Sequence, residues 1–423
     1  MSDVGCRVAF YSHDTMGLGH MRRNLLLAQV LQRSQVRAVV LLIAGAREAG
    51  LVTAATGVDC VALPSLHKDE LGQYHPRHVA ISLAELLVLR AKTALAALDA
   101  FAPDVLIVDN VPRGAGRELD PVLASVRARG RTRLVLGLRD VLDDPAILRD
   151  EWVRSQNEDA IRRYYDAVWI YGDPTVYDPV REYGFAPDVA AKVRFTGYFD
   201  ERARLPFGGA DSDAPIGGGA LERKGARLAL CLLGGGQDGA RLAEAFLQAE
   251  LPPDTYGVVV MGPSMPADVR EALAGRAAGR PRRQVVPFLL EPTRLLQRAT
   301  HVVTMGGYNS VCEVLSFAKP ALIVPRVEPR QEQLIRAERF RALGLVDVLH
   351  PRDLSPAALT AWLAAARARV QPARERIDFN GLMRVPRLLE EVLGRRPPLS
   401  ARRRRRAEVH RAANGRRGDR VEA

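Results

Sequence analysis

Short apolar runs alternate with longer amphipathic stretches along most of this chain. In the first half the runs are rich in Val, Ile and Leu on both faces, as strands covered on both sides require. They predict strands over Arg7–Tyr11, Val36–Ile43, Val58–Leu63, Val105–Asp109, Arg133–Leu138, Ala167–Tyr171 and Val193–Thr196. The amphipathic stretches predict helices over Arg22–Gln32, His78–Leu98 and Asp144–Tyr165. This alternation is typical of an α/β fold, a parallel sheet wrapped by helices.

The pattern stops at a Gly-, Asp- and Ser-rich stretch, Pro206–Gly225, which predicts a flexible linker. It then restarts with a strand over Arg227–Leu233, a glycine cluster and a helix from about Ala240. We therefore predict two Rossmann-like domains facing across a cleft, with ligands at the carboxyl ends of the strands. The predicted division is an N-terminal domain over 1–204, a linker over 205–226, a second domain over 227–371, a C-terminal helix over 372–394 and a basic disordered tail over 395–423.

Composition supports a two-domain protein and locates its excess charge. The 423 residues are 47% hydrophobic, and no apolar run approaches the ~18 residues of a membrane-spanning helix. The tail over 395–423 has eleven arginines against three acids, so it carries +8 of the net +12. Without interleaved aromatics the tail predicts no specific nucleic-acid binding. It is either a solvated appendage or a contact with anionic lipid.

The first residues of the sequence, which run directly into an apolar strand, lead us to expect no secretory leader. The four scattered cysteines predict reduced thiols, which are typical of a reducing compartment. We therefore expect a cytoplasmic protein, with peripheral attachment to the inner face of the membrane if its tail binds lipid.

The segment Thr304–Glu313 carries the strongest chemical signal. A strand ends in Gly306-Gly307, and a helix is predicted to start at Asn309 or Ser310. The unpaired amides and positive dipole end of such a helix bind anions such as a diphosphate. Glu313 lies one turn further on, where a carboxylate could accept both ribose hydroxyls. The alternative is an ordinary glycine turn with Asn309 or Ser310 as the N-cap.

The residues that follow favour the anion-binding interpretation. Lys319-Pro320, the strand over Ala321–Pro325 and Glu332-Gln333 at the next helix start complete a pattern that resembles the donor-binding half of glycosyltransferase family 28. The resemblance implies a GT-B architecture and inverting, metal-independent transfer from a nucleotide sugar, with UDP expected as the nucleotide. It also implies that Gly306, Gly307, Asn309 and Ser310 hold the diphosphate, that Glu313 holds the ribose, and that Glu332 and Gln333 touch the donor sugar.

Two more segments of the second half agree with this resemblance. Gly234-Gly235-Gly236 stands where the family has a loop over the donor phosphates, and glycines let a backbone approach a ligand closely. A tight strand–helix turn is the alternative. Phe288 and Leu290 lie in a stretch that resembles the family's nucleobase-reading segment.

In the first half, the loop after the first strand contains Gly17 and Gly19 and ends in His20. The family has a similar loop on the acceptor side. The loop lacks the third glycine of a dinucleotide fingerprint, so we expect no nicotinamide or flavin cofactor. At a helix start the dipole would keep His20 neutral, which predicts a general base or an acceptor contact. A helix-start hydrogen bond is the alternative.

Charged residues also follow two strands of the predicted N-terminal sheet. Asp109 and Asp140 are alternative bases, and Arg113 and Arg139 are candidate acceptor contacts. They could equally be a helix cap and an ion pair. No metal site is predicted, because Asp211 and Asp213 lie in the linker and the histidines His67, His75 and His78 lack a second ligand pair.

The expected partners are a nucleotide-sugar donor and an acceptor that the sequence does not identify. Two rival functions remain open. One is a nucleotide-sugar hydrolase or epimerase, and the other is a non-catalytic nucleotide-sugar-binding protein.

Overall fold

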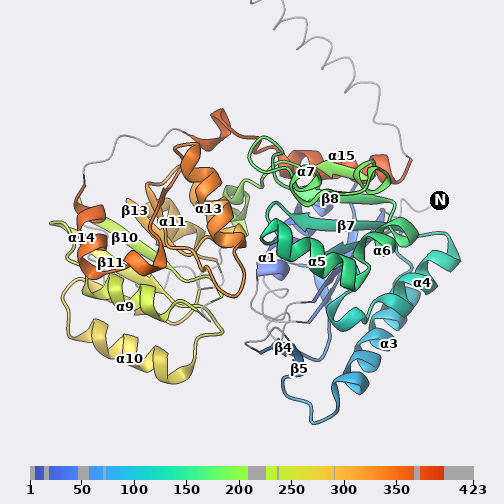
Figure 1. The fold of residues 1–423 in the computed structure, drawn as a ribbon, viewed down its shortest axis with the longest axis horizontal. Helices are drawn as coiled ribbons and strands as arrows, with labels where there is room; N and C mark the ends of the chain where they lie inside the picture. Colours follow the sequence, from blue (N-terminus) through green and yellow to red (C-terminus); the bar gives the residue numbers. More distant parts are fainter. Residues whose placement is uncertain are drawn as a thin grey trace, which may run out of the picture.

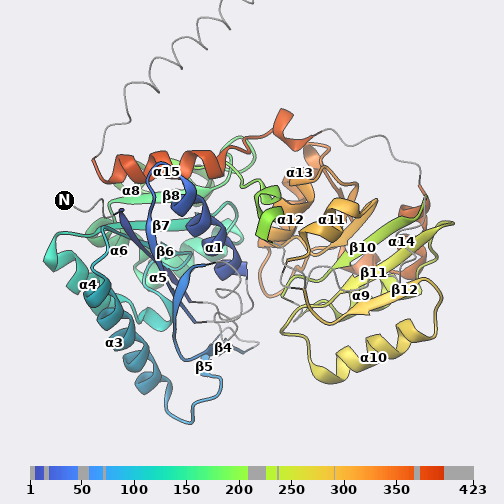
Figure 2. The same cartoon turned by 180° about the vertical axis from the view of Figure 1, so that it is seen from behind.

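The chain forms two α/β lobes that lie side by side (Figures 1 and 2). The computed structural model describes residues 5–13, 19–45, 57–69, 73–207, 225–235, 238–289, 291–365 and 372–394. Most of the predicted linker and the whole predicted basic tail lie outside these residues.

The first lobe contains a seven-stranded parallel sheet in the order β3-β2-β1-β6-β7-β8-β9. Its central strands are buried because their side chains are apolar on both faces. The strands are β1 (Arg7–Ser12), β2 (Val39–Ala44), β3 (Asp59–Ala62), β6 (Val105–Asp109), β7 (Arg133–Arg139), β8 (Ala167–Tyr171) and β9 (Val193–Phe195). Each was predicted from its apolar run. A short antiparallel hairpin, β4 (Leu66–Lys68) and β5 (Tyr74–Pro76), contains His67 and His75.

Helices cover both faces of this sheet. The predicted helix over Asp144–Tyr165 is instead two helices, because Gln156 adopts a left-handed conformation (φ 52°) that ends one and begins the other. The helix predicted from His78 starts later, after a capping box formed by Ser82 and Glu85. The helices are α1 (Gly19–Arg33), α3 (Leu83–Phe101), α4 (Asp120–Arg129), α5 (Pro145–Ser155), α6 (Asn157–Tyr164), α7 (Pro179–Tyr183) and α8 (Pro187–Ala190), with the 3-10 turn η1 (Ala115–Arg117). A further 3-10 turn, η2 (Glu201–Phe207), packs against the second lobe.

The second lobe contains a six-stranded parallel sheet in the order β12-β11-β10-β13-β14-β15. Its strands are β10 (Arg227–Leu232), β11 (Thr255–Val260), β12 (Arg283–Val286), β13 (His301–Thr304), β14 (Ala321–Ile323) and β15 (Asp347–Val348). Its helices are α9 (Ala240–Gln248), α10 (Ala267–Ala278), α11 (Thr293–Arg298), α12 (Tyr308–Ser316), α13 (Glu332–Ala342) and α14 (Pro356–Ala364), with the 3-10 turn η5 (Pro351–Asp353). The predicted fold class, two Rossmann-like α/β domains, is confirmed.

The last described segment returns to the first lobe, where α15 (Gly381–Val392) packs beside α1 (Figures 1 and 2). It is shorter than the helix predicted from Pro372, because the chain first makes the 3-10 turn η6 (Ala373–Glu375) and a loop. The Tyr198 amide donates to the Asp378 carbonyl at 2.8 Å, and the Gly381 amide donates to the Tyr198 carbonyl at 3.0 Å. A Cβ at Gly381 would lie 2.5 Å from the Phe199 ring, so only glycine permits this approach.

None of the helices in the described ranges is long and apolar enough to cross a membrane.

Candidate active site

The glycine loop of the first domain meets the start of α12 in the second. Asn309 Nδ2 donates to the carbonyl oxygen of Gly19 at 2.8 Å. Gly19 is the first residue of α1, and His20 is the next. Two segments that the sequence assigned to opposite sides of one site therefore touch. Of the predicted loop, Gly17 lies outside the described residues.

The amino end of α12 faces this contact with unoccupied amides. The helix begins at Tyr308, and Gly307 is its N-cap without any side-chain cap. Neither Asn309 nor Ser310 therefore caps the helix, as the alternative reading required. The first intrahelical bond runs from the Val311 amide to the Gly307 carbonyl at 3.0 Å. The amides of Tyr308, Asn309 and Ser310 donate to no acceptor in the described part of the chain, so they are available to an anion.

The two glycines before α12 have different surroundings. A Cβ on Gly306 would lie 2.9 Å from the Gln333 carbonyl oxygen, so α13 packs closely against this residue. A Cβ on Gly307 would meet no heavy atom of the described residues within 4 Å. Space therefore remains beside Gly307, next to the unoccupied amides.

The loop after β10 lies beside the same helix end. Gly234 has φ +61°, a conformation that favours glycine, and a Cβ there would lie 3.9 Å from Ser310 Oγ. Gly235 packs against Gly262. Gly236 lies outside the described residues, as does Leu290, whereas Phe288 is 37% exposed.

At the start of α13, Glu332 is buried and forms an ion pair with Arg326 at 2.6 Å. Arg326 also donates to Asp238 at 3.2 Å. The Gln333 side chain is committed through Oε1, which accepts from the Arg326 amide at 3.0 Å. Arg326 was not predicted. Through its contacts with Glu332 and Asp238, Arg326 ties the loop after β14 both to α13 and to the glycine loop.

Partly exposed His20 and fully buried Asp109 form a dyad in the first domain. His20 Nδ1 lies 2.5 Å from Asp109 Oδ2, and Arg23 donates to both carboxylate oxygens at 2.6 and 2.8 Å. Burial raises the pKa of Asp109, but Arg23 and His20 outweigh it and hold that pKa well below the ordinary value. Burial lowers the pKa of His20, and the opposing effect of Asp109 does not restore it. His20 is therefore a neutral imidazole near pH 7, oriented by a charged carboxylate.

Asp140, the other candidate base, is committed to the domain interface. It is fully buried, pairs with Arg336 of α13 at 2.8 Å and accepts from Tyr198 Oη at 3.0 Å. Arg336 also donates to the carbonyls of Gly306 at 3.0 Å and Val141 at 2.8 Å. In this arrangement Asp140 holds the two domains together and lacks the geometry of a base.

The two candidate acceptor arginines differ in their contacts. Arg113 makes a bidentate ion pair with Asp120 at 2.6 Å and donates to the Ser155 carbonyl at 3.0 Å, which gives it a structural role. Arg139, at the end of β7, makes no hydrogen bond or ion pair with a described residue, and its Nε is buried. Burial lowers its pKa to about 10; Glu332 opposes this shift, and nearby Arg336 and Arg23 add to it.

Glu313 lies in a buried interdomain charge cluster. Its Oε1 accepts from Arg22 of α1 at 2.8 Å, and no described group donates to its Oε2. Arg22 also pairs with Glu291 at 3.2 Å, and Glu291 pairs with Arg204 of η2 at 3.2 Å. Burial raises the pKa of Glu313, against the opposing effect of Arg22. The predicted ribose ligand therefore has one oxygen occupied and one available.

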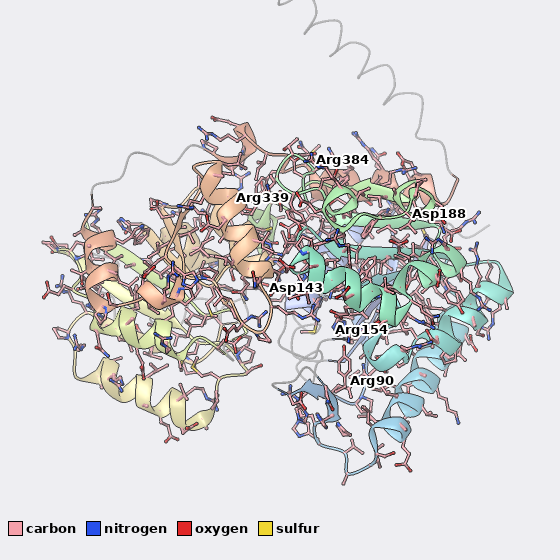
Figure 3. The ribbon with its side chains drawn as sticks, in the orientation of Figure 1. Arg90, Asp143, Arg154, Asp188, Arg339 and Arg384 are labelled. Atoms are coloured by element: carbon pink, nitrogen blue, oxygen red, sulfur yellow. The ribbon has the colours of Figure 1, made fainter. Side chains whose placement is uncertain are left out.

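Further contacts hold the interface at its rim. Asp143 Oδ1 accepts from the Gln331 amide at 2.9 Å, and Arg330 pairs with Glu151 at 3.0 Å. Figure 3 shows Asp143 on the side of the first lobe that faces the second. The two domains are thus in direct contact around the predicted site.

Comparison with known proteins supports this reading of the second domain. Residues 229–390 match the glycosyltransferase family 28 C-terminal domain. The chain carries a glycosyltransferase family 28 domain on a GT-B fold. The family resemblance seen in the sequence is thereby confirmed for this part of the chain, and with it the enzyme class, a glycosyltransferase. Among curated proteins, none matches the chain in sequence.

Solved structures similar to the whole chain show the fold of both domains. The calicheamicin glycosyltransferase CalG4 is 20% identical, with a TM-score of 0.60 over 93% of this chain and 100% of that one. MurG of Acinetobacter baumannii is 16% identical, with a TM-score of 0.55 over 91% and 99%. A Listeria monocytogenes protein assigned provisionally as a UDP-N-acetylglucosamine 2-epimerase is 15% identical, with a TM-score of 0.58 over 94% and 99%.

Most residues that sequence reasoning missed at this site are buried or largely buried arginines. They are Arg22, Arg23, Arg204, Arg326 and Arg336. Two of them had a local signal, because Arg22 and Arg23 directly follow the glycine loop and His20. Arg336 lies 196 positions from Asp140. Arg204 and Arg326 each pair with a distant acid, Glu291 and Asp238, as well as with a near one, so no short motif reveals these contacts.

Proposed function

We propose that this glycosyltransferase moves a sugar from a nucleoside-diphosphate sugar, with UDP as the expected nucleotide, to an acceptor hydroxyl. Transfer proceeds with inversion and without a metal ion. The observation that carries the proposal is the contact between Gly19 and Asn309, because it sets the His20–Asp109 dyad beside the unoccupied amides of α12. A base and an anion site are what this reaction requires.

On the donor side, the amides of Tyr308, Asn309 and Ser310 would bind the diphosphate. They are fixed dipoles at the positive end of a helix, so they stabilise the charge that develops on the departing diphosphate without reorganising. The glycine loop at Gly234–Gly235 lies beside them and lets the backbone approach the phosphates. Glu313 Oε2 would accept from the ribose, while Arg22 donates to its Oε1.

On the acceptor side, the charge on Asp109 favours the His20 tautomer with its proton on Nδ1, which leaves Nε2 as the proton acceptor. Nε2 takes the proton from the acceptor hydroxyl, whose oxygen bonds to C1 of the donor sugar. The bond between C1 and the diphosphate oxygen breaks, and the diphosphate leaves with the electron pair. A single displacement of this kind inverts the configuration at C1.

The test is a donor screen followed by one variant. Purified full-length chain is titrated with UDP and dTDP sugars, and transfer is then followed with fractionated cell extract as the acceptor source. His20→Ala should reduce transfer by about 10²–10⁴-fold and leave UDP affinity unchanged. A fully active variant would remove His20 from the mechanism.

The similarity to the Listeria protein keeps an epimerase or hydrolase as the second candidate. Nucleotide release that needs no acceptor would indicate a hydrolase. A donor sugar converted to its epimer, with the nucleotide still attached, would indicate an epimerase. Donor that binds and is recovered unchanged under every condition would indicate a binding protein.

A further inference from the structure

Two charged side chains from opposite domains each have one buried atom without a hydrogen-bond partner in the described residues. One is the Nε of Arg139, at the end of β7 in the first domain. The other is the Oε2 of Glu332, at the start of α13 in the second domain. Glu332 is 96% buried, since its relative exposure is 4%. Unpartnered buried polar atoms of this kind indicate a group that is missing between them.

The neighbouring charges do not satisfy Arg139. The nearby acids are already paired, Asp109 with Arg23 and His20, and Asp140 with Arg336. Arg23 and Arg336 themselves act on Arg139 as like charges. The site around Arg139 is therefore short of one anion.

Glu332 does not satisfy Arg139 either. Its Oε1 is paired with Arg326 at 2.6 Å, which leaves only Oε2. The ion pair between Arg336 and Asp140 sets the start of α13 against the end of β7. Among the described residues, Arg139 and Glu332 nevertheless form no direct ion pair. They therefore flank a position that a ligand group can occupy.

The chemistry of that group follows from the two side chains. A guanidinium binds the two oxygens of a carboxylate or phosphate with parallel hydrogen bonds. A carboxylate oxygen accepts from a hydroxyl or an N–H. A carbohydrate with an acidic substituent supplies both, and a neutral sugar supplies only the second. Asp109 pairs with Gly137 in the register of β6 and β7, so the end of β7 at Arg139 lies near the His20–Asp109 dyad and the proposed base.

We propose that Arg139 and Glu332 form an interdomain subsite for an acidic carbohydrate group, with its oxyanion on Arg139 and a hydroxyl donating to Glu332. The subsite rests on the proposed function, whose sugar and acceptor meet at this place. The acid belongs either to the donor, as a nucleotide-linked uronic acid, or to an acidic acceptor sugar.

The donor arm of the test compares two nucleotide sugars that differ in one carboxylate. Full-length chain is titrated calorimetrically with UDP, UDP-glucose and UDP-glucuronate. If the donor carries the acid, UDP-glucuronate should bind at least about tenfold more tightly than UDP-glucose. Arg139→Gln should abolish this preference and leave UDP affinity unchanged, which also shows that the variant is folded. Arg339→Gln removes an exposed arginine paired with Glu182 and should behave like the wild type (Figure 3).

The acceptor arm uses methyl glucoside and methyl glucuronide, titrated with and without saturating UDP. A preference for the glucuronide that is lost in Arg139→Gln, without a preference between the nucleotide sugars, assigns the acid to the acceptor. The proposal is overturned if neither pair is distinguished, or if Arg139→Gln leaves the preference intact. Failure of every nucleotide to bind would instead count against the proposed function, and the glycoside pair without nucleotide would still report on the subsite.

Discussion

Arg22 of α1 donates to Glu313 of α12 at 2.8 Å, across the interface between the two domains. The two residues are 291 positions apart in the chain, and both side chains are largely buried. A residue from the first domain thus pairs with the glutamate that the family resemblance assigns to the donor ribose. The pair links domain contact to donor binding.

Replacing Arg22 with Met should destabilise the protein by about 3 kcal/mol, because it leaves the buried carboxylates of Glu313 and Glu291 without their shared cation. The measurement is the free energy of unfolding in urea. Arg339→Gln, which removes an exposed ion pair, is the control and should cost less than about 1 kcal/mol. A double-mutant cycle with Glu313→Gln should show coupling between the two sites; additive effects would contradict the pair.

The rate of transfer should depend on the protonation of His20. The imidazole acts as a base only when unprotonated, and burial lowers its pKa below the ordinary 6.5. The rate should therefore be constant near pH 7 and fall in acid, with an apparent pKa under 6.5. Asp109 raises the pKa of His20, so Asp109→Asn should lower the rate and shift the acid limb to still lower pH. A limb that moves to higher pH would be inconsistent with the dyad.

Substitutions of the two glycines before α12 should change different properties: protein stability at Gly306 and UDP affinity at Gly307. Gly306→Ala places a Cβ 2.9 Å from the Gln333 carbonyl and should cost about 1–3 kcal/mol of stability. Gly307→Val should preserve stability, since its backbone has φ −62° and described atoms leave space there. Its side chain would nevertheless crowd the helix amides and weaken UDP binding at least about tenfold. Unfolding curves and calorimetry separate the two effects, and normal UDP affinity in Gly307→Val would argue against the anion site.

Stability and turnover of an Asp140 variant test whether Asp140 has a structural role or is the base in place of His20. Asp140→Asn removes the counter-charge of buried Arg336 and should cost about 3–5 kcal/mol. If Asp140 were the base, the same change would also abolish transfer by the folded variant, at temperatures well below its unfolding transition. Thermal unfolding and turnover, measured on one preparation, decide between the two roles.

Much of the fold was predictable because strands and helices follow local periodicity. The runs at Val105–Asp109 and Ala167–Tyr171 coincide with β6 and β8, since strands buried on both faces need unbroken apolar sequence. The break at Gln156 was missed, because a left-handed residue between two amphipathic segments leaves the apolar pattern almost unchanged.

The sequence by itself determined the two α/β domains and the glycine-ended strand that opens α12 with unpaired amides. Only the tertiary structure decided which charges meet. Asp109 and Asp140 look alike in sequence, yet one orients His20 and the other binds Arg336 of the second domain. The physical reason is range. Hydrophobic periodicity acts between near neighbours in the chain, whereas ion pairs need atoms within a few ångströms, which the packing of the two domains alone brings together.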